Sequence, residues 1–199
     1  YAGGTVITGG TVRVSADNKL GNSAGALTLD GGTLRNTSGF STARDTTLGA
    51  AGGTFETDGV TILTHNGDIG GAGSLTKTDS GTLLLAGNNT YAGGTVITSG
   101  KVQVSANGNL GDSAGALSFD GGTLRNTSGF TTSRSTTLGA GGGTFETDAA
   151  TTLRHLGSIS GVGGLTKTGG GTLLLQGNKA YSGGTNINGG TVSISADNR

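Results

Sequence analysis

An internal repeat of 90 residues constrains this chain more than any other feature. Tyr1, Tyr91 and Tyr181 open equivalent segments, and residues 1–90 and 91–180 align with 63 identities and no insertion or deletion. The third copy, 181–199, breaks off after its first strand-like runs. Repetition of this fidelity predicts an array, in which each unit buries apolar side chains against its neighbours. We therefore expect residues 1–199 to form one segment of such an array, and a fragment of a longer protein.

A shorter period lies inside the repeat. Runs rich in Val, Ile, Leu and Thr come in four pairs, each joined by a glycine corner: 5–7 with 11–14, 26–29 with 33–35, 47–48 with 54–57, and 75–77 with 82–85. Four pairs in 90 residues give about 22 residues per pair. Short strands at this spacing are typical of β-helix coils, and the consensus and helical return of leucine-rich repeats are missing. The sequence predicts an all-β fold, a right-handed parallel β-helix (solenoid) with about nine coils of about 22 residues.

Alternation within each run predicts which side chains face the interior. We expect an inward position for eight residues, with Thr and charged residues facing water: Val12, Val14, Leu83, Leu85, Val102, Val104, Leu173 and Leu175. Glycine suits the corners because it adopts positive φ without steric cost, and asparagine can do the same. Four asparagines fall at such corners: Asn88, Asn89, Asn178 and Asn188.

The composition excludes several classes of protein. The chain has 44 glycines, 4% aromatic residues and no cysteine, which excludes disulfides and cysteine-ligated zinc. Twelve basic and twelve acidic residues leave no net charge, so we expect no nucleic-acid partner. No run reaches the roughly 18 apolar residues of a membrane helix, so we expect no membrane insertion by this segment.

Carboxylates form the best candidate for chemistry. Glu56 and Asp58 lie two residues apart on one predicted strand, near Asp30 of the preceding coil, and their copies are Glu146, Asp148 and Asp120. Such groups serve polysaccharide-cleaving β-helices, and they could also form a weak calcium site. A duplicated group is more typical of a scaffold than of a single active site. We interpret it as a solvated acidic face.

The other candidates also have plain interpretations. We expect the equivalent residues His65 and His155 on the surface, because no cysteine or G-x-S-x-G serine accompanies them. Glycine runs such as 141–143 are interpreted as corners, since no Lys-Ser/Thr follows them. Arg35 and Arg125 are expected to face solvent, with a ligand-contacting stripe as the alternative. The sequons at Asn36 and Asn126 would be glycosylated only in a eukaryotic secreted protein. We assign no catalytic, cofactor-binding or metal-binding residue.

One motif resembles a known family. The segment GVGGLTKTGGGTLLLQGNKAYSGGTNINGGTV, from Gly161 to Val192, is similar to the autotransporter passenger-associated strand repeat, roughly G-x-G-x-L-T-K-x-G-x-G-T-L-x-L-x-G-x-N-x-Y-x-G-x-T-x-I-x-x-G. The pattern recurs from Gly71 to Val102, and residues 1–12 match its end. The departures, Asp79, Ser99 and Lys101, fall at expected corners or outward positions.

The resemblance implies a secreted or surface-displayed bacterial passenger whose β-helix crosses the outer membrane through a C-terminal barrel outside this segment. It implies a structural or interaction module that aids passenger folding and secretion, as a rigid stalk, adhesin or self-association surface. Expected partners are adjacent coils of the same passenger, other copies, and ligands on host or neighbouring cells. The alternatives are a β-helical enzyme acting on polysaccharide, or its scaffold, and an ice- or mineral-binding threonine array, which needs a regular T-x-T on every coil.

Overall fold

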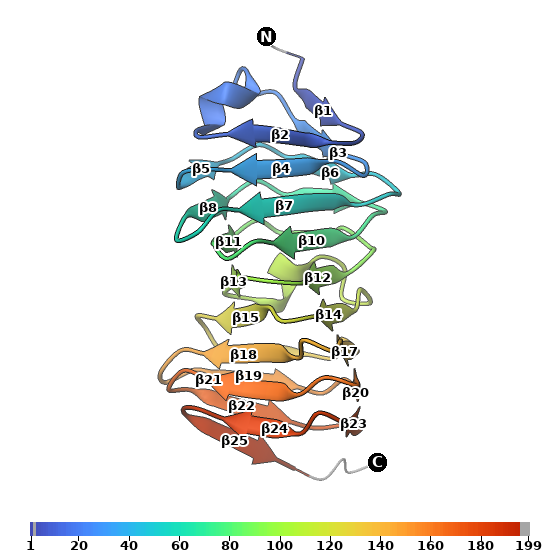
Figure 1. Cartoon of the computed structure of the whole chain (residues 1–199), viewed down its shortest axis with the longest axis vertical. Coiled ribbons are helices and arrows are strands. Elements are labelled where there is room, and N and C mark those ends of the chain that lie inside the picture. Colours follow the sequence, from blue (N-terminus) through green and yellow to red (C-terminus); the bar gives the residue numbers. More distant parts are fainter. Residues whose placement is uncertain (2, 196–199) are drawn as a thin grey trace.

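The chain forms a parallel β-solenoid, a rod of stacked coils with the first and the last described strands at opposite ends (Figure 1). The computed structural model describes residues 1 and 3–195, so the end of the third copy, 196–199, lies outside the described residues. Every strand pairing in this part of the chain is parallel, and each strand bonds to strands about one coil away in sequence. The all-β solenoid fold is confirmed.

The strands form four sheets along the rod. Sheet 1 contains β1 (Thr5–Ile7), β3 (Leu27–Leu29), β6 (Thr46–Leu48) and β9 (Ile69–Gly71). Sheet 2 contains β2 (Thr11–Val14), β4 (Thr33–Asn36), β7 (Gly53–Thr57), β10 (Leu75–Thr78), β12 (Thr95–Ile97), β14 (Leu117–Phe119), β17 (Thr136–Leu138), β20 (Ile159–Gly161) and β23 (Lys179–Tyr181). Sheet 3 contains β5 (Phe40–Thr42), β8 (Ile62–His65), β11 (Thr82–Leu85), β13 (Lys101–Val104), β15 (Thr123–Asn126), β18 (Gly143–Thr147), β21 (Leu165–Thr168) and β24 (Thr185–Ile187). Sheet 4 contains β16 (Phe130–Thr132), β19 (Thr152–His155), β22 (Thr172–Leu175) and β25 (Thr191–Ile194).

The register of sheet 2 gives the length of a coil. One column of residues that pair from strand to strand runs from Thr11 through residues 33, 54, 76, 96, 118, 137 and 160 to Ala180. This column spans 169 residues in eight steps. A coil therefore contains about 21 residues, slightly fewer than the 22 that the sequence predicts. At about 4.8 Å per coil, nine coils make a rod about 40 Å long.

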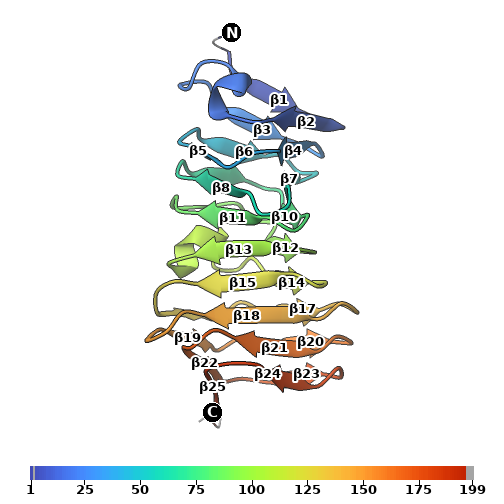
Figure 2. The same cartoon turned by 60° about the vertical axis from the view of Figure 1, so that its left-hand side comes forward.

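The 90-residue repeat does not close on a whole number of coils. In repeat 1 the second strand of each coil belongs to sheet 2, but β10 of that sheet pairs with β12, the first strand of repeat 2. Likewise β11, the third strand of its coil, pairs with β13, the second run of repeat 2. Each repeat thus advances the chain by four coils and one strand. Equivalent strands such as β7 and β18 consequently lie in different sheets (Figure 2).

A short loop replaces one strand in each repeat. In repeat 1 it contains the 3-10 helix η1 (Asp17–Leu20), and in repeat 2 it contains η2 (Asn107–Leu110). Sheet 1 ends at β9 and sheet 4 begins at β16, because the η2 loop stands between them. Leu20 and Leu110 are buried, so each loop also contributes an apolar side chain to the core.

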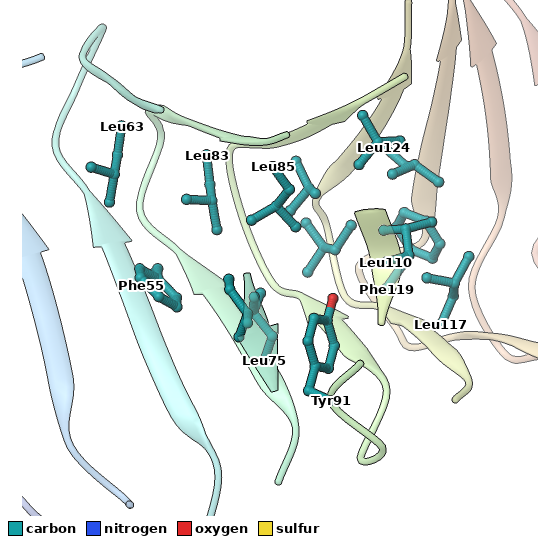
Figure 3. Packing of buried hydrophobic residues seen from close by; sticks show 14 of the residues in the cluster. Phe55, Leu63, Leu75, Leu83, Leu85, Tyr91, Leu110, Leu117, Phe119 and Leu124 are labelled. Carbon is teal, nitrogen blue, oxygen red and sulfur yellow. The ribbon is translucent and has the colours of Figure 1, made fainter. Parts of the chain in front are cut away.

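The core is a column of inward-facing aliphatic side chains with a few aromatic rings (Figure 3). Seven of the eight residues predicted to face inward are buried, and Val12, in the first coil, is partly buried against the same core. The expectation that charged residues face water is wrong for Lys77 and Lys167, which are completely buried. Each stands two residues after a buried leucine on its strand, so alternation points it inward.

Glycine at the corners serves close packing as well as turning. A Cβ on Gly73 would lie 1.9 Å from the carbonyl oxygen of Gly49 in the coil above it, and Gly142 has φ 67°. The asparagines do not use the left-handed conformation: the non-glycine residues with positive φ in the described part of the chain are Asp79 and Ala150. Asn89 instead links coils, since its side chain accepts the Ile69 amide and donates to the Asn109 carbonyl.

Candidate functional site

Three carboxylates of repeat 1 come together where β7 and β10 end. Oxygen atoms of Glu56, Asp58 and Asp79 lie within 4.8 Å of one another. Asp79 joins the group because it follows Glu56 by one coil and one residue in the register of the two strands. Asp30, the partner expected from sequence, is not part of the group; its carboxylate accepts the backbone amide of Ala51 at 2.9 Å.

Arg35 provides the positive charge for these carboxylates. Its Nε and Nη2 donate to the two oxygens of Asp58 at 2.8 and 3.0 Å, and its Nη1 lies 3.3 Å from Glu56. The bidentate bond to Asp58 raises the pKa of Arg35, so the guanidinium stays charged. The group is a half-exposed ionic ladder across three coils. It agrees better with the expected solvated acidic face than with a calcium site, which needs six or more free oxygen ligands.

Repeat 2 preserves the arginine pairs and loses the third carboxylate. Nε of Arg125 lies 2.8 Å from Oδ1 of Asp148 and 3.5 Å from Oε1 of Glu146. Nζ of Lys101 lies 2.6 Å from the other carboxylate oxygen of Glu146. Position 169, equivalent to Asp79, is glycine. The Asp120 carboxylate accepts a hydrogen bond from the Gly141 amide at 2.7 Å, just as the Asp30 carboxylate accepts one from the Ala51 amide. The repeated element is therefore an Arg, Glu and Asp ladder, which lies on sheet 2 in one repeat and on sheet 3 in the next.

The two histidines are inside the solenoid, so their predicted surface position is wrong. His65 and His155 are both 0% exposed, and each Nε2 lies 2.8 Å from a threonine hydroxyl, that of Thr46 or Thr136. Burial lowers the pKa of both imidazoles to about 4, so they are neutral at pH 7. They follow the inward-facing Leu63 and Leu153 by two residues, a signal that alternation could have provided. They act as polar core residues.

Two buried arginines fix the replacement loops, and sequence reasoning missed them. Arg44 donates to the Asp17 carboxylate at 2.8 Å and to loop carbonyls that include those of Gly21 and Gly25. Arg134 repeats the arrangement with one difference, because Asn107 stands in place of Asp17 and accepts from Nε at 3.1 Å. Both arginines are at most 3% exposed. Their presence in both repeats, among variable neighbours, was the available signal.

The lysines of the L-T-K motif secure a corner of the coil. Lys77 donates from Nζ to the carbonyls of Thr78 and Asp79, both at 2.6 Å, and Lys167 does the same with Thr168 and Gly169. Burial lowers the pKa of Lys77 to about 8. The motif therefore supplies hydrogen-bond donors to carbonyl groups that point into the corner, a structural role.

Neither sequon presents an accessible asparagine. Asn36 and Asn126 are completely buried, and each Nδ2 donates to the carbonyl two residues on and to a threonine hydroxyl, that of Thr61 or Thr151. Glycosylation would require the loss of these bonds.

An open groove of about 370 Å³ follows one corner of repeat 2. Gly142, Gly164 and Gly184 line it, and Thr144 and Thr166 stand beside them in adjacent strands. No charged or aromatic side chain lines the groove. These glycine runs are corners, as the sequence predicts, and they form no phosphate cradle, because no helix follows them.

Comparisons with known proteins agree with this architecture. The passenger-associated-transport-repeat model matches residues 1–14, 75–104 and 165–194. Three stretches of the chain carry the passenger-associated transport repeat. The three matches fall on equivalent positions, each ending in the strand pair that opens a 90-residue repeat, and two of them include the L-T-K lysines. The passenger resemblance inferred from the sequence is confirmed.

One curated relative extends the comparison. The adhesin BmaC autotransporter of Brucella suis biovar 1 (strain 1330) is 46% identical over 89 residues, which cover 45% of this chain and 3% of the relative. The chain thus spans a small fraction of that protein. No solved structure gives a significant match. The matches to the passenger repeat and to an autotransporter adhesin imply a surface-displayed or secreted protein. In the described part of this chain, no helix is long and apolar enough to cross a membrane.

Proposed function

We propose that this segment is a rigid spacer of an autotransporter passenger, which holds more distal parts away from the cell. The unbroken nine-stranded sheet 2 carries this proposal, because it hydrogen-bonds every coil from β2 to β23 to the next. Buried arginines, lysines and histidines add side-chain bonds to backbone and neighbouring coils. A rod built in this way resists bending better than domains joined by flexible linkers.

The faces of the rod supply an adhesive function, as a self-association surface or as a binding surface for host or neighbouring cells. Its relative is named an adhesin. The ionic ladder occurs in both repeats, and an uncharged groove lies along one corner of the rod. Nothing in the arrangement favours an enzyme: the carboxylates are held by arginines, and the histidines are buried away from them. We place the segment outside the outer membrane, connected to a barrel elsewhere in the passenger.

Small-angle X-ray scattering tests the spacer function. The chain should scatter as a rod about 40 Å long, and insertion of one further 90-residue repeat should lengthen it by about 21 Å, the rise of four coils and one strand. An unchanged or bent envelope after the insertion would contradict the proposal.

Chain-coated beads test the adhesive function separately. Clumping of beads with one another would identify self-association, and attachment to epithelial cells would identify a host ligand. If the beads neither clump nor attach to cells, the adhesive function is contradicted, while the spacer function is unaffected.

A further inference from the structure

The loop of repeat 2 holds its buried arginine without a carboxylate. Arg134 is 2% exposed, and its donors meet the Asn107 side-chain oxygen at 3.1 Å, the Asn107 carbonyl at 3.2 Å and further loop carbonyls. All of these acceptors are neutral. In repeat 1 the equivalent Arg44 has the Asp17 carboxylate as its partner, with bonds of 2.8 and 3.2 Å from Nε and Nη2.

Asn107 is followed by Gly108, the neighbour that least obstructs attack on an asparagine side chain, because glycine has no Cβ. Gly108 is exposed, and a Cβ built on it would meet a single atom within 4 Å, Asn88 Oδ1 at 3.3 Å. Its carbonyl accepts the Asn89 amide, while its own amide has no hydrogen-bond partner among the described residues. The nitrogen that would attack is therefore not held by another bond.

We propose that Asn107 is a self-modification site, at which deamidation creates the aspartate that repeat 1 already has at position 17. The Gly108 nitrogen attacks Cγ of Asn107 and loses its proton, the bond from Cγ to the amide nitrogen breaks, and ammonia leaves. Water then opens the succinimide at the bond between Cγ and the Gly108 nitrogen, which restores the main chain and leaves a carboxylate. The net change is one water taken up and one ammonia released.

Arg134 favours both parts of this reaction. Its Nε donates to the oxygen on which negative charge develops when Cγ is attacked, and such a donor stabilises that charge most in a partly buried site. After ring opening, the same nitrogen pairs with a carboxylate in place of an amide, which makes a stronger, charge-assisted bond. Opening at the other carbonyl would give isoaspartate, which adds a methylene to the main chain at the start of η2 and displaces the Asn107 carbonyl from Nη2. The folded loop therefore selects aspartate.

Two other Asn-Gly pairs provide internal references. Asn188 is exposed, and no arginine bonds to its side chain in the described structure. Gly67, which follows Asn66, is enclosed, since a Cβ there would lie 2.2 Å from the Arg44 carbonyl oxygen. We expect isoaspartate to predominate at position 188, and we expect Asn66 to stay an amide.

Peptide mapping by mass spectrometry after incubation of the folded chain at neutral pH tests the proposal. Asn107 should gain the mass of an amide converted to an acid, with aspartate exceeding isoaspartate. The Gly108→Asn variant, which restores the residue of repeat 1, should slow the conversion at least tenfold. The proposal is overturned if Asn107 remains an amide over the time in which it converts in the urea-unfolded chain, or if isoaspartate predominates at position 107.

Thermal melting provides a second readout that is independent of the reaction rate. Asn107→Asp should raise the melting temperature by about 3 °C, because it adds the ion pair that Arg134 lacks. Asn188→Asp, where no arginine is in contact, should leave it unchanged. A lower melting temperature for Asn107→Asp than for the unmodified chain would overturn the pairing argument.

Discussion

Thr76 and Val96 lie opposite each other in the register of β10 and β12, although they occupy different places in the 90-residue repeat. Thr76 belongs to the second strand of its coil, whereas Val96, the equivalent of Val6, belongs to the first strand of repeat 2. The pairing is possible because four coils need fewer than 90 residues. The residues left over after four coils supply one further strand, which moves each feature of the repeat to the next sheet. The ionic ladder of Arg35 and that of Arg125 therefore lie on different sheets.

Asp79→Gly should stabilise the chain by about 1 kcal/mol, since Asp79 has φ 60° and its equivalent is Gly169 with φ 74°. The change also removes one of three adjacent carboxylates. Urea unfolding measures the gain. Gly169→Asp is the reciprocal control, with an expected loss of at least this size, because a Cβ on Gly169 would lie 2.2 Å from the carbonyl oxygen of Thr147. A loss of stability in Asp79→Gly would indicate that the carboxylate makes a bond worth more than the backbone strain.

Acid should weaken the solenoid through its buried histidines. Burial lowers the pKa of His65 and His155 from 6.5 to about 4, so between these values the unfolded chain binds protons that the folded chain does not. The stability that the neutral histidines provide is complete above pH 6.5 and is lost as pH falls to about 4, at most about 3 kcal/mol for each residue. NMR titration of the imidazole protons should give midpoints near 4; midpoints near 6.5 would show that the rings reach water.

Loss of a loop arginine should be costly. Arg44→Met leaves the Asp17 carboxylate and several loop carbonyls without their donor, and we expect a loss of about 3 kcal/mol or more. Arg13→Ala is the matched control, because Arg13 is exposed on β2 and should change stability by less than about 0.5 kcal/mol. Hydrogen exchange of the loop backbone will show whether η1 is released; equal exchange in both variants would argue against the docking role of Arg44.

The sequence predicted two runs for each coil of repeat 1, but it missed three strands: β5, β8 and β9. β8 was missed although it contains Ile62 and Leu63, whereas β9 gives little signal. Ile69–Gly71 is β9, yet two of its three residues are glycine. Without it, the run at 75–77 was paired with 82–85 as if it opened a coil, although β10 is the second strand of its coil. This omission gave a coil of 22 residues and concealed the advance by one strand.

Buried polar residues were the other part that the sequence could not fully reveal. Alternation places Lys77 and His65 on the inward side, but composition favours the surface for such residues. The hydrogen bonds that make their burial possible come from carbonyls and hydroxyls of adjacent coils or corners, such as Thr46 for His65. Likewise, Asp79 joined Glu56 and Asp58 because of a register that only the structure shows.

Cysteine cross-linking measures the central claim, the advance of four coils and one strand per repeat, most directly. The chain has no native cysteine, so a Thr76→Cys/Val96→Cys double variant carries only the two thiols of interest. A short bifunctional thiol reagent should join them efficiently within one chain, because outward residues of paired parallel strands lie about 5 Å apart. In a repeat of four whole coils Val96 would follow Gly70 on sheet 1, so efficient cross-linking in Gly70→Cys/Val96→Cys, and none between positions 76 and 96, would contradict the claim.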